Sequence, residues 1–167
     1  HDNPLQKASR SFNSYVKSVT LENYKNIDTV CDLACGKGQD LFRYGNSGLA
    51  HLYGAEIDAT AISEFIQRKH EFSNDRQHKH MSINACLADL TDNPEVNLSK
   101  FISMGLPADG FKLVICNFAF HYFLGSNGSL RHLIGLLDKI LAPGGRFLFT
   151  AFDGASIIRL LNENDLN

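Results

Sequence analysis

Apolar runs and amphipathic segments alternate along the chain. Five short apolar runs have the length of strands and lie at 27–35, 51–57, 82–89, 112–120 and 146–152. Three segments between them carry apolar residues at the helical spacing of three and four positions, at 41–49, 60–72 and 129–141. A weaker helical pattern covers 94–104, and a last helix is predicted to begin near Ala155. This alternation predicts parallel strands joined by helical crossovers.

The helices predicted at 60–72 and 129–141 each have one apolar face, and the helix predicted to begin near Ala155 has an apolar side. The apolar residues are, in order of the three helices, Ile62, Phe65, Ile66 and Phe72; Leu130, Leu133, Ile134, Leu137 and Leu141; and Ile157, Ile158 and Leu161. Between the second and third helices, the sequence Pro143-Gly144-Gly145 predicts a turn into the strand at 146–152. We therefore predict an α/β fold with a doubly wound, mostly parallel sheet, whose ligands bind at the carboxyl ends of the strands.

Composition narrows the classes of function. With 44% hydrophobic and 20% charged residues, the 167-residue chain is typical of one soluble globular domain. Its apolar runs are far shorter than the roughly 20 residues of a membrane helix, and we expect neither a membrane span nor a secretory signal. Sixteen Lys and Arg against 18 Asp and Glu give a formal net charge of −2. That balance disfavours a protein that coats nucleic acid but permits a small basic pocket.

The four cysteines lie in or beside apolar stretches and form no CxxC pair: Cys31, Cys35, Cys86 and Cys116. Zinc sites and disulfide frameworks have tighter or more regular spacing. The sequence therefore predicts reduced, mostly buried thiols in an intracellular protein, and no metal site.

A glycine-containing loop, DLACGKGQD at 32–40, follows the first predicted strand. Such loops let the backbone approach a ligand closely. The dinucleotide fingerprint GxGxxG is absent, because Leu41 stands where the third glycine would be. Asp32 and Asp40 flank the loop around Gly36, and two carboxylates would repel a diphosphate. They would suit a ligand that carries an ammonium group.

Two further acids end the next strands. Glu56 lies 20 residues after the first glycine of the loop, where an acid can accept hydrogen bonds from both ribose hydroxyls. Asp89 ends the third strand and can accept one from an adenine amino group. Asp58 competes with Glu56 for the ribose, and the spacing favours Glu56. The alternative is that the loop carboxylates cap a helix and Glu56 is solvated. A nucleoside joined to an amino acid fits all four acids, which predicts S-adenosylmethionine as cofactor and S-adenosylhomocysteine as product.

Four stretches resemble the mRNA cap guanine-N7 methyltransferases, which are class I methyltransferases. NSYVKS at 13–18 is similar to the family's leader, and the loop at 32–40 resembles its DLGCGKGGD motif. NFAFHYF at 117–123 is similar to its phenylalanine–histidine–tyrosine segment, and LAPGGRFLFTAFDG at 141–154 to its fifth strand. The resemblance runs from about residue 13 to residue 158.

The loop residues Asp32, Gly36 and Asp40 are already predicted to contact the cofactor, and the resemblance implies further site residues. It implies cofactor contacts from Lys17, Ala34, Glu56, Asp89, Asn117 and Tyr122. It implies contacts to the cap from Asn13, Ser14, Lys37, Arg43, Arg68, Phe118, His121 and Tyr122. Departures from the family pattern are Ala34 and Gln39 for glycines, Glu56 for an aspartate, and Phe152 for a proline.

The implied reaction is an in-line methyl transfer to guanine N7. Because N7 carries a lone pair and no proton, no residue is predicted to act as acid or base. Phe118, His121 and Tyr122 are instead expected to orient the guanine. Arg68 also fits the solvated face of a helix, and His121 also fits a packed core residue. Three alternatives stay open: a methyltransferase of adenine or cytosine amino groups, which would carry prolines at 118 and 119; a small-molecule methyltransferase; and a non-catalytic cofactor-binding subunit.

The resemblance also implies an organisation and partners. Residues 1–25 are expected to form a leader that contributes to the cofactor and cap sites, and 26–167 the cofactor-binding core. The family's sheet closes with two further strands, so the core is expected to lack its carboxy-terminal strands. Related domains belong to multifunctional capping enzymes of large DNA viruses. The implied partners are the capped 5′ end of mRNA (GpppN-RNA), other capping-enzyme domains and a stimulatory subunit. The implied location is the nucleus for a cellular protein, or the cytoplasm and virion for a viral one.

Overall fold

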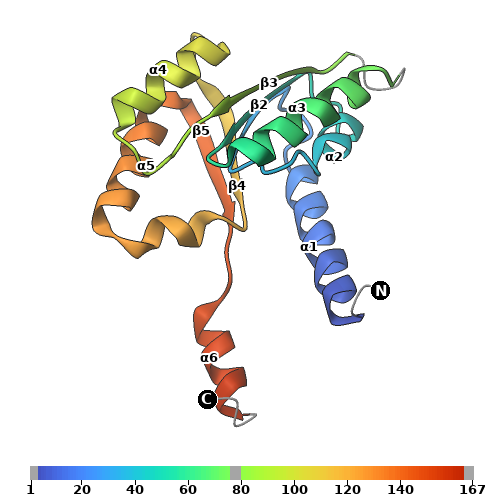
Figure 1. The fold of residues 1–167 in the computed structure, drawn as a ribbon, viewed down its shortest axis with the longest axis vertical. Coiled ribbons are helices and arrows are strands. Elements are labelled where there is room, and N and C mark those ends of the chain that lie inside the picture. Colours follow the sequence, from blue (N-terminus) through green and yellow to red (C-terminus); the bar gives the residue numbers. More distant parts are fainter. Residues whose placement is uncertain (1–3, 76–79, 164–167) are drawn as a thin grey trace.

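Five parallel strands form one sheet in the computed structural model, which describes residues 4–75 and 80–163 (Figure 1). They are β1 (Thr29–Leu33), β2 (His51–Glu56), β3 (Ser82–Leu87), β4 (Phe111–Asn117) and β5 (Leu141–Thr150). Their order across the sheet is β3-β2-β1-β4-β5, and every neighbouring pair is parallel. The strand order reverses between β1 and β4, so the expected ligand crevice lies at the carboxyl ends of these two strands. The predicted doubly wound α/β fold is confirmed.

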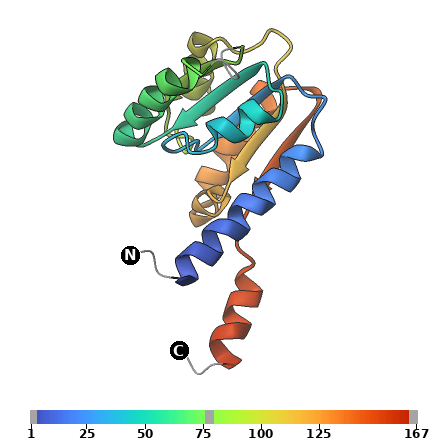
Figure 2. The same cartoon turned by 90° about the vertical axis from the view of Figure 1, so that its right-hand side faces the viewer.

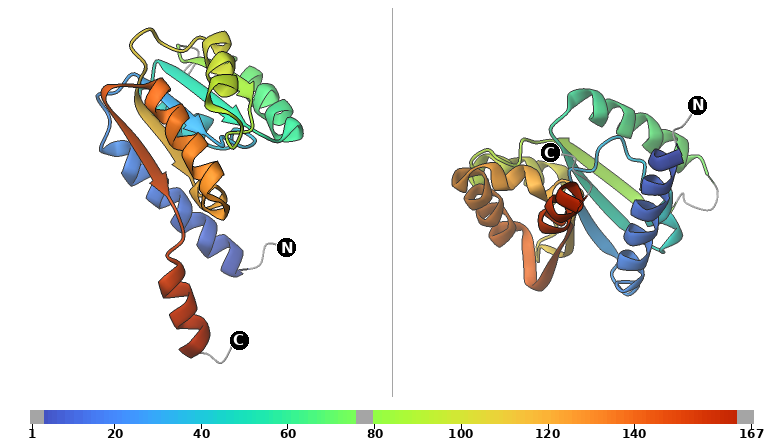
Figure 3. Two further views of the ribbon diagram at one scale, coloured as in Figure 1. Left: turned by 90° about the vertical axis from the view of Figure 1, so that its left-hand side faces the viewer. Right: turned by 90° about the horizontal axis from the view of Figure 1, so that it is seen from below.

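Helices cover both faces of this sheet (Figure 3). The covering helices are α1 (Pro4–Glu22), α2 (Leu41–Asn46), α3 (Ala59–Ser73), α4 (Pro94–Met104) and α5 (Asn127–Ile140). A 3₁₀ helix, η1 (Phe120–Gly125), precedes α5, and α6 (Gly154–Glu163) follows β5. Successive residues of β4 alternate between two cores, since Leu113 and Ile115 pack with residues of α1–α3 while Val114 and Cys116 pack with residues of α4 and α5. Two covered faces explain the nearly unbroken apolar runs of the central strands. All four cysteines are free; Cys31 and Cys116 are buried and the other two are half-buried.

The turn predicted at Pro143-Gly144-Gly145 is wrong. Strand β5 begins at Leu141 and includes all three residues. The register between β4 and β5 shifts at this point, and Gly144 has a φ of 73°. A Cβ on Gly145 would lie 2.7 Å from the carbonyl oxygen of Phe111. The segment is therefore a bulge inside a continuous strand, and it needs glycine where the two backbones approach closely.

The predicted apolar faces are correct at their centres and wrong at their rims. Phe65, Phe72 and Leu133 are buried, whereas Ile66 is 47% and Ile134 is 56% exposed. Ile66 borders an open hollow of about 350 Å³ beside β3, the last strand on that side of the sheet. Periodicity alone does not reveal how wide the surface under a helix is.

Helix α6 extends away from the sheet (Figure 2). Its predicted apolar side, with Ile157, Ile158 and Leu161, is exposed over its whole length. Among the helices of residues 4–75 and 80–163, none combines the length and apolarity that crossing a membrane requires.

Candidate functional site

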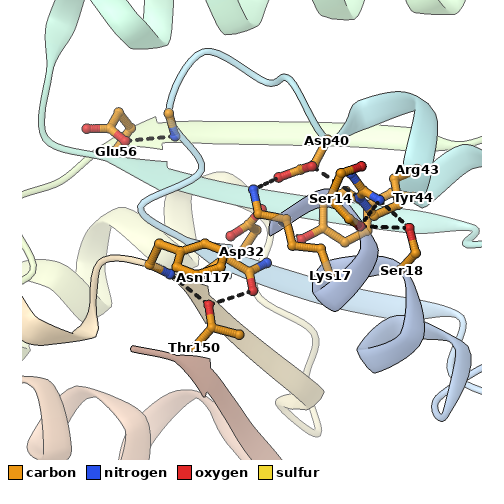
Figure 4. Close-up of polar contacts among 12 residues, drawn as sticks. Ser14, Lys17, Ser18, Asp32, Asp40, Arg43, Tyr44, Glu56, Asn117 and Thr150 are labelled. Carbon is orange, nitrogen blue, oxygen red and sulfur yellow. Dashed lines mark hydrogen bonds and ion pairs between the residues drawn. The ribbon is translucent and has the colours of Figure 1, made fainter. Parts of the chain in front are cut away.

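Three connections meet at the carboxyl edge of the sheet, and α1 lies beside them (Figure 4). The residues concerned are the loop 34–40 after β1, Glu56 at the end of β2, and Asn117 and Phe118 at the end of β4. These are sequence-predicted positions, and the fold brings them to one edge. Figure 4 shows Lys17 of α1 pointing toward the same region.

The loop after β1 has an unusual backbone. Ala34, Gly36 and Gly38 have φ values of 61°, 57° and 73°, in the left-handed region. A non-glycine residue in this region carries a strain of about 1–2 kcal/mol, so Ala34 is held there by its surroundings. A Cβ on Gly36 would meet nothing within 4 Å, whereas one on Gly38 would lie 2.9 Å from the Phe65 ring. The loop is therefore packed at Gly38 and open at Gly36.

Glu56 connects the first two strand ends. It is only 8% exposed, and its Oε2 accepts a hydrogen bond from the Gly36 N–H at 2.8 Å. Its Oε1 accepts from the N–H groups of Ile57 and Asp58 at 2.9 and 3.0 Å. The Asp58 carboxylate instead caps α3 by accepting from Thr60 and Ala61. Glu56 thus holds the glycine loop, while Asp58 serves a helix.

Asp32 lies inside β1 and is 4% exposed. Burial raises the pKa of its carboxyl to about 7, although the Tyr44 hydroxyl lowers that pKa by donating a hydrogen bond at 2.8 Å. The sequence reasoning missed Tyr44. The available signal was an acid within an apolar strand, which requires a donor from the helix that covers it.

Asp40 joins the loop to α1. Its carboxylate pairs with Lys17 Nζ at 2.6 Å and with Arg43 Nε at 3.2 Å. The other nitrogens of Arg43 donate to the carbonyl and hydroxyl of Ser14 at 2.9 and 3.0 Å, and to the Ser18 hydroxyl. Arg43 and Ser14, both implied as cap contacts, thus fasten α1 onto α2.

Asp89 follows β3, and its carboxylate is turned toward its own loop. Its Oδ1 accepts hydrogen bonds from the N–H and hydroxyl of Thr91 at 2.8 and 2.6 Å. The buried Asn97 donates to the Asp89 carbonyl at 2.7 Å, and His132 Nδ1 lies 2.6 Å from the Thr91 carbonyl. Helices α4 and α5 therefore fix the position of this acid.

A strained residue also ends β4. Phe118 has a φ of 56°, and its N–H donates to the hydroxyl and the carbonyl of Thr150 at 2.9 and 3.1 Å. The Thr150 hydroxyl donates to Asn117 Oδ1 at 3.3 Å. Thr150, which sequence reasoning also missed, holds the end of β4 in place. The strand predicted to reach residue 120 ends at Asn117 because of this left-handed turn.

Four rings gather beside this turn, and we call Phe118, His121, Tyr122 and Phe152 the aromatic cluster. Ring centroids of His121 and Tyr122 are 4.2 Å apart, and Phe152 lies 6.0 Å from Phe118 and 5.8 Å from His121. Lys17 Nζ lies 5.8 Å from the centre of the Phe118 ring. The cluster therefore borders the charged residues around Asp40.

Other predicted residues lie outside these contacts. Lys37 is exposed and pairs with Glu64 at 2.8 Å. Asn13 is half-buried on α1. Arg68 lies in the third turn of α3, about 13 Å along the helix from the sheet edge. Its side chain forms no hydrogen bond or ion pair with any residue that the structure describes.

The chain matches the mRNA (guanine-N(7))-methyltransferase domain family over residues 6–167. It is 33% identical to an mRNA-capping enzyme of African swine fever virus, a match that covers 96% of this chain and 19% of the viral one. It is 30% identical to mRNA cap guanine-N(7) methyltransferase 1 of rice, with 93% of this chain and 42% of the plant protein covered.

Solved structures share the fold. A protein of Pyrococcus horikoshii superposes with a TM-score of 0.61 at 19% identity, over 98% of this chain and 62% of that one. A glycopeptide N-methyltransferase in complex with sinefungin gives a TM-score of 0.56 at 17% identity, over 80% and 51%.

Proposed function

The chain belongs to the mRNA (guanine-N(7))-methyltransferase family, and we propose that it transfers the methyl group of S-adenosylmethionine to N7 of the guanosine cap of mRNA. The observation that carries this proposal is the family match, which includes both the acid-lined glycine loop and the aromatic cluster. The chain spans about a fifth of the viral relatives and about two fifths of the rice protein. Because these relatives are much longer than the chain, we propose the activity for the chain and do not transfer it from them.

The residues at the carboxyl edge suit S-adenosylmethionine. The loop is open at Gly36, so a ligand can approach its backbone. Glu56 ends β2 and would accept from the ribose, and Asp89 lies two residues after β3 and would accept from the adenine amino group. Asp32 and Asp40 lie nearer to α1 and would attract the ammonium of the amino-acid part. When bound, this cofactor supplies a methyl group activated by a positively charged sulfur.

The aromatic cluster suits a guanine acceptor. Stacking of a base on an aromatic ring contributes about 1–3 kcal/mol, and the cluster offers four rings. A ring nitrogen that bears a lone pair and no proton needs no base, so the task of the chain is alignment. Lys17 lies between the aromatic cluster and Asp40, where its charge would face the cap's phosphates or the cofactor's carboxylate.

The proposed macromolecular partner is the capped 5′ end of mRNA. The viral relative is named an mRNA-capping enzyme and is about five times as long as the match. We propose that other capping-enzyme domains act on the same RNA end, in the cytoplasm for a viral protein or the nucleus for a cellular one.

A methyl-transfer assay tests the proposal. Purified protein is incubated with S-adenosylmethionine carrying a labelled methyl group and a short RNA that ends in an unmethylated guanosine cap. A matched RNA already methylated at N7 is the control. Calorimetric titration with the cofactor, run in parallel, separates binding from catalysis.

Label on the unmethylated cap alone is the expected result. Equal labelling of both RNAs would identify another acceptor atom and refute transfer to N7. Cofactor binding without labelling of either RNA would contradict methyl transfer by this chain and favour a cofactor-binding subunit.

A further inference from the structure

The outer edge of β3 is open. This strand ends one side of the sheet, and no strand among residues 4–75 and 80–163 pairs with its outer edge. Helices α3 and α4 flank it on the two faces (Figure 1). Two open hollows of about 350 and 400 Å³ lie along the edge, on the sides of α3 and α4. Both are lined by Ala85, Ser103 and Met104, so they form one continuous surface, which we call the edge groove.

The edge groove concentrates positive charge in a chain whose formal net charge is −2. Lys69 and His70 line it from α3 and Lys100 lines it from α4, while Asn84, Ser99 and Ser103 add uncharged hydrogen-bonding groups. None of the described residues that line either hollow is Asp or Glu. Lys69 and Lys100 have no ion-pair partner among the described residues, so their charges are available to an external anion.

The remaining groups of the edge groove carry no negative charge. Burial raises the pKa of the Cys86 thiol, which keeps it protonated, although Lys100 opposes this effect. Like any sheet edge, β3 also presents backbone N–H groups that have no partner strand. Cations, neutral donors and free N–H groups are the chemistry that binds a phosphate backbone.

We propose that the edge groove binds the sugar–phosphate backbone of single-stranded RNA downstream of the cap. This inference rests on the proposed function, because it assigns a place to the RNA chain that carries the cap. A peptide strand that adds to β3 would need pockets for alternate apolar side chains. Ile66 and Met104 are the only large apolar side chains that line the edge groove in the described residues, so its chemistry favours RNA.

The position of the edge groove sets a length requirement. Helix α3 begins at the sheet edge that carries the candidate site, and Lys69 lies about 15 Å along the helix from that end. The aromatic cluster lies at the end of β4, three strand spacings of about 4.8 Å across the sheet from β3, so the straight distance from the cap to Lys69 is on the order of 20 Å. At roughly 3.4 Å per stacked nucleotide, about six nucleotides cover this distance. The edge groove should therefore act on capped RNAs longer than this and leave a cap dinucleotide unaffected.

Charge reversal tests the inference. The variant K69E/K100E is compared with K112E/R131E, which changes the same amount of charge at exposed positions outside the edge groove. K69Q/K100Q serves as a milder second variant, and thermal unfolding verifies that each protein is folded. Binding of a fluorescent, uncapped 20-nucleotide RNA is measured by anisotropy at several salt concentrations. KM for methylation is measured with the cap dinucleotide GpppG and with the capped form of the 20-nucleotide RNA.

For K69E/K100E we expect the Kd for the 20-mer and the KM for its capped form to rise about tenfold. The slope of log Kd against log salt should fall by about 1.4, since each contact to a single-strand phosphate contributes about 0.7. KM for GpppG and all constants of K112E/R131E should stay unchanged.

Equal weakening by the two double variants would refute the inference, because any loss of positive charge would then suffice. Unchanged RNA binding by K69E/K100E would also refute it and leave a peptide strand as the occupant to examine. If the unmodified chain methylates neither substrate but its RNA binding still depends on Lys69 and Lys100, the proposed function fails and the edge groove stands.

Discussion

The two halves of the candidate site differ in how far the chain satisfies its own polar groups. On the side of β1 and β2, each acid has internal partners: Asp32 accepts from Tyr44, Asp40 from Lys17 and Arg43, and Glu56 from three backbone N–H groups. On the side of β4 the aromatic cluster is open. Tyr122 is 72% exposed, and the buried Nδ1 of His121 has no hydrogen-bond partner among the described residues.

This difference indicates two modes of recognition. Charged groups that are already held in place lose little entropy and need little reorganisation when a charged ligand arrives. Exposed rings gain most of their contacts from the ligand itself. We call the side with Asp32, Asp40 and Glu56 the acidic half and the side with the aromatic cluster the aromatic half. Substitutions in the acidic half should therefore change both ligand binding and the stability of the protein, whereas substitutions in the aromatic half should change ligand binding alone.

The largest expected effect concerns Asp32 and pH. Burial raises its pKa to about 7, against 3.8 for an ordinary aspartate. Between these values the folded chain holds a proton that the unfolded chain releases, so the contribution of Asp32 to the free energy of unfolding falls as pH rises through this window. Three pKa units correspond to a loss on the order of 4 kcal/mol between about pH 4 and pH 7. Above pH 7 the contribution is constant.

Urea unfolding from pH 4.5 to 7.5 measures this effect. Asp32→Asn is the comparison, because an amide does not titrate and still accepts the Tyr44 hydrogen bond. The unmodified chain should lose stability with rising pH more steeply than the variant. Parallel curves for the two proteins would show that Asp32 takes up no proton in this range.

Glu56 gives the next largest effect. In Glu56→Gln the amide nitrogen cannot accept a hydrogen bond, so one of the two contact sets, to Gly36 or to Ile57 and Asp58, is lost. We expect a loss of about 3 kcal/mol in cofactor binding, or roughly 100-fold in Kd, and a lower melting temperature. Calorimetry and thermal unfolding measure the two quantities.

Glu71→Gln is the matched control, since Glu71 is exposed on α3 and its side chain accepts from Gln67. It should change neither quantity. Unaltered cofactor binding in Glu56→Gln would remove Glu56 from the binding site.

In the aromatic half, His121→Ala should separate binding from stability. Loss of one stacking ring is expected to raise KM for capped RNA about 10- to 30-fold, or about 2 kcal/mol, with an unchanged Kd for the cofactor. Its melting temperature should fall much less than that of Glu56→Gln, since Nδ1 has no partner to lose. A cofactor Kd that rises together with KM would contradict the division into two halves.

Sequence periodicity predicted most of the fold, and the acids after the predicted strands placed the loop, Glu56 and Asp89 at one edge of the sheet. The family resemblance, which the match to the family confirms, singled out Lys17, Asn117 and the Phe118 segment. Tyr44 and Thr150 were missed because their roles depend on contacts across 12 and 32 positions, which no local pattern contains. The bulge in β5 was missed for a similar reason, since Pro-Gly-Gly indicates a turn unless a neighbouring strand extends it.

The smallest effect concerns the loop backbone, through Ala34→Gly. Glycine relieves the strain at a φ of 61°, about 1–2 kcal/mol, but increases the entropy of the unfolded chain by about 0.4–1 kcal/mol. A net stabilisation of about 0.5 kcal/mol is expected, together with unchanged cofactor binding, because a backbone contact survives the loss of a methyl group. Urea unfolding and calorimetry measure both. If the glycine variant bound the cofactor more weakly, Ala34 would contribute through its side chain, and the acidic half would depend on the shape of its loop as well as on its charges.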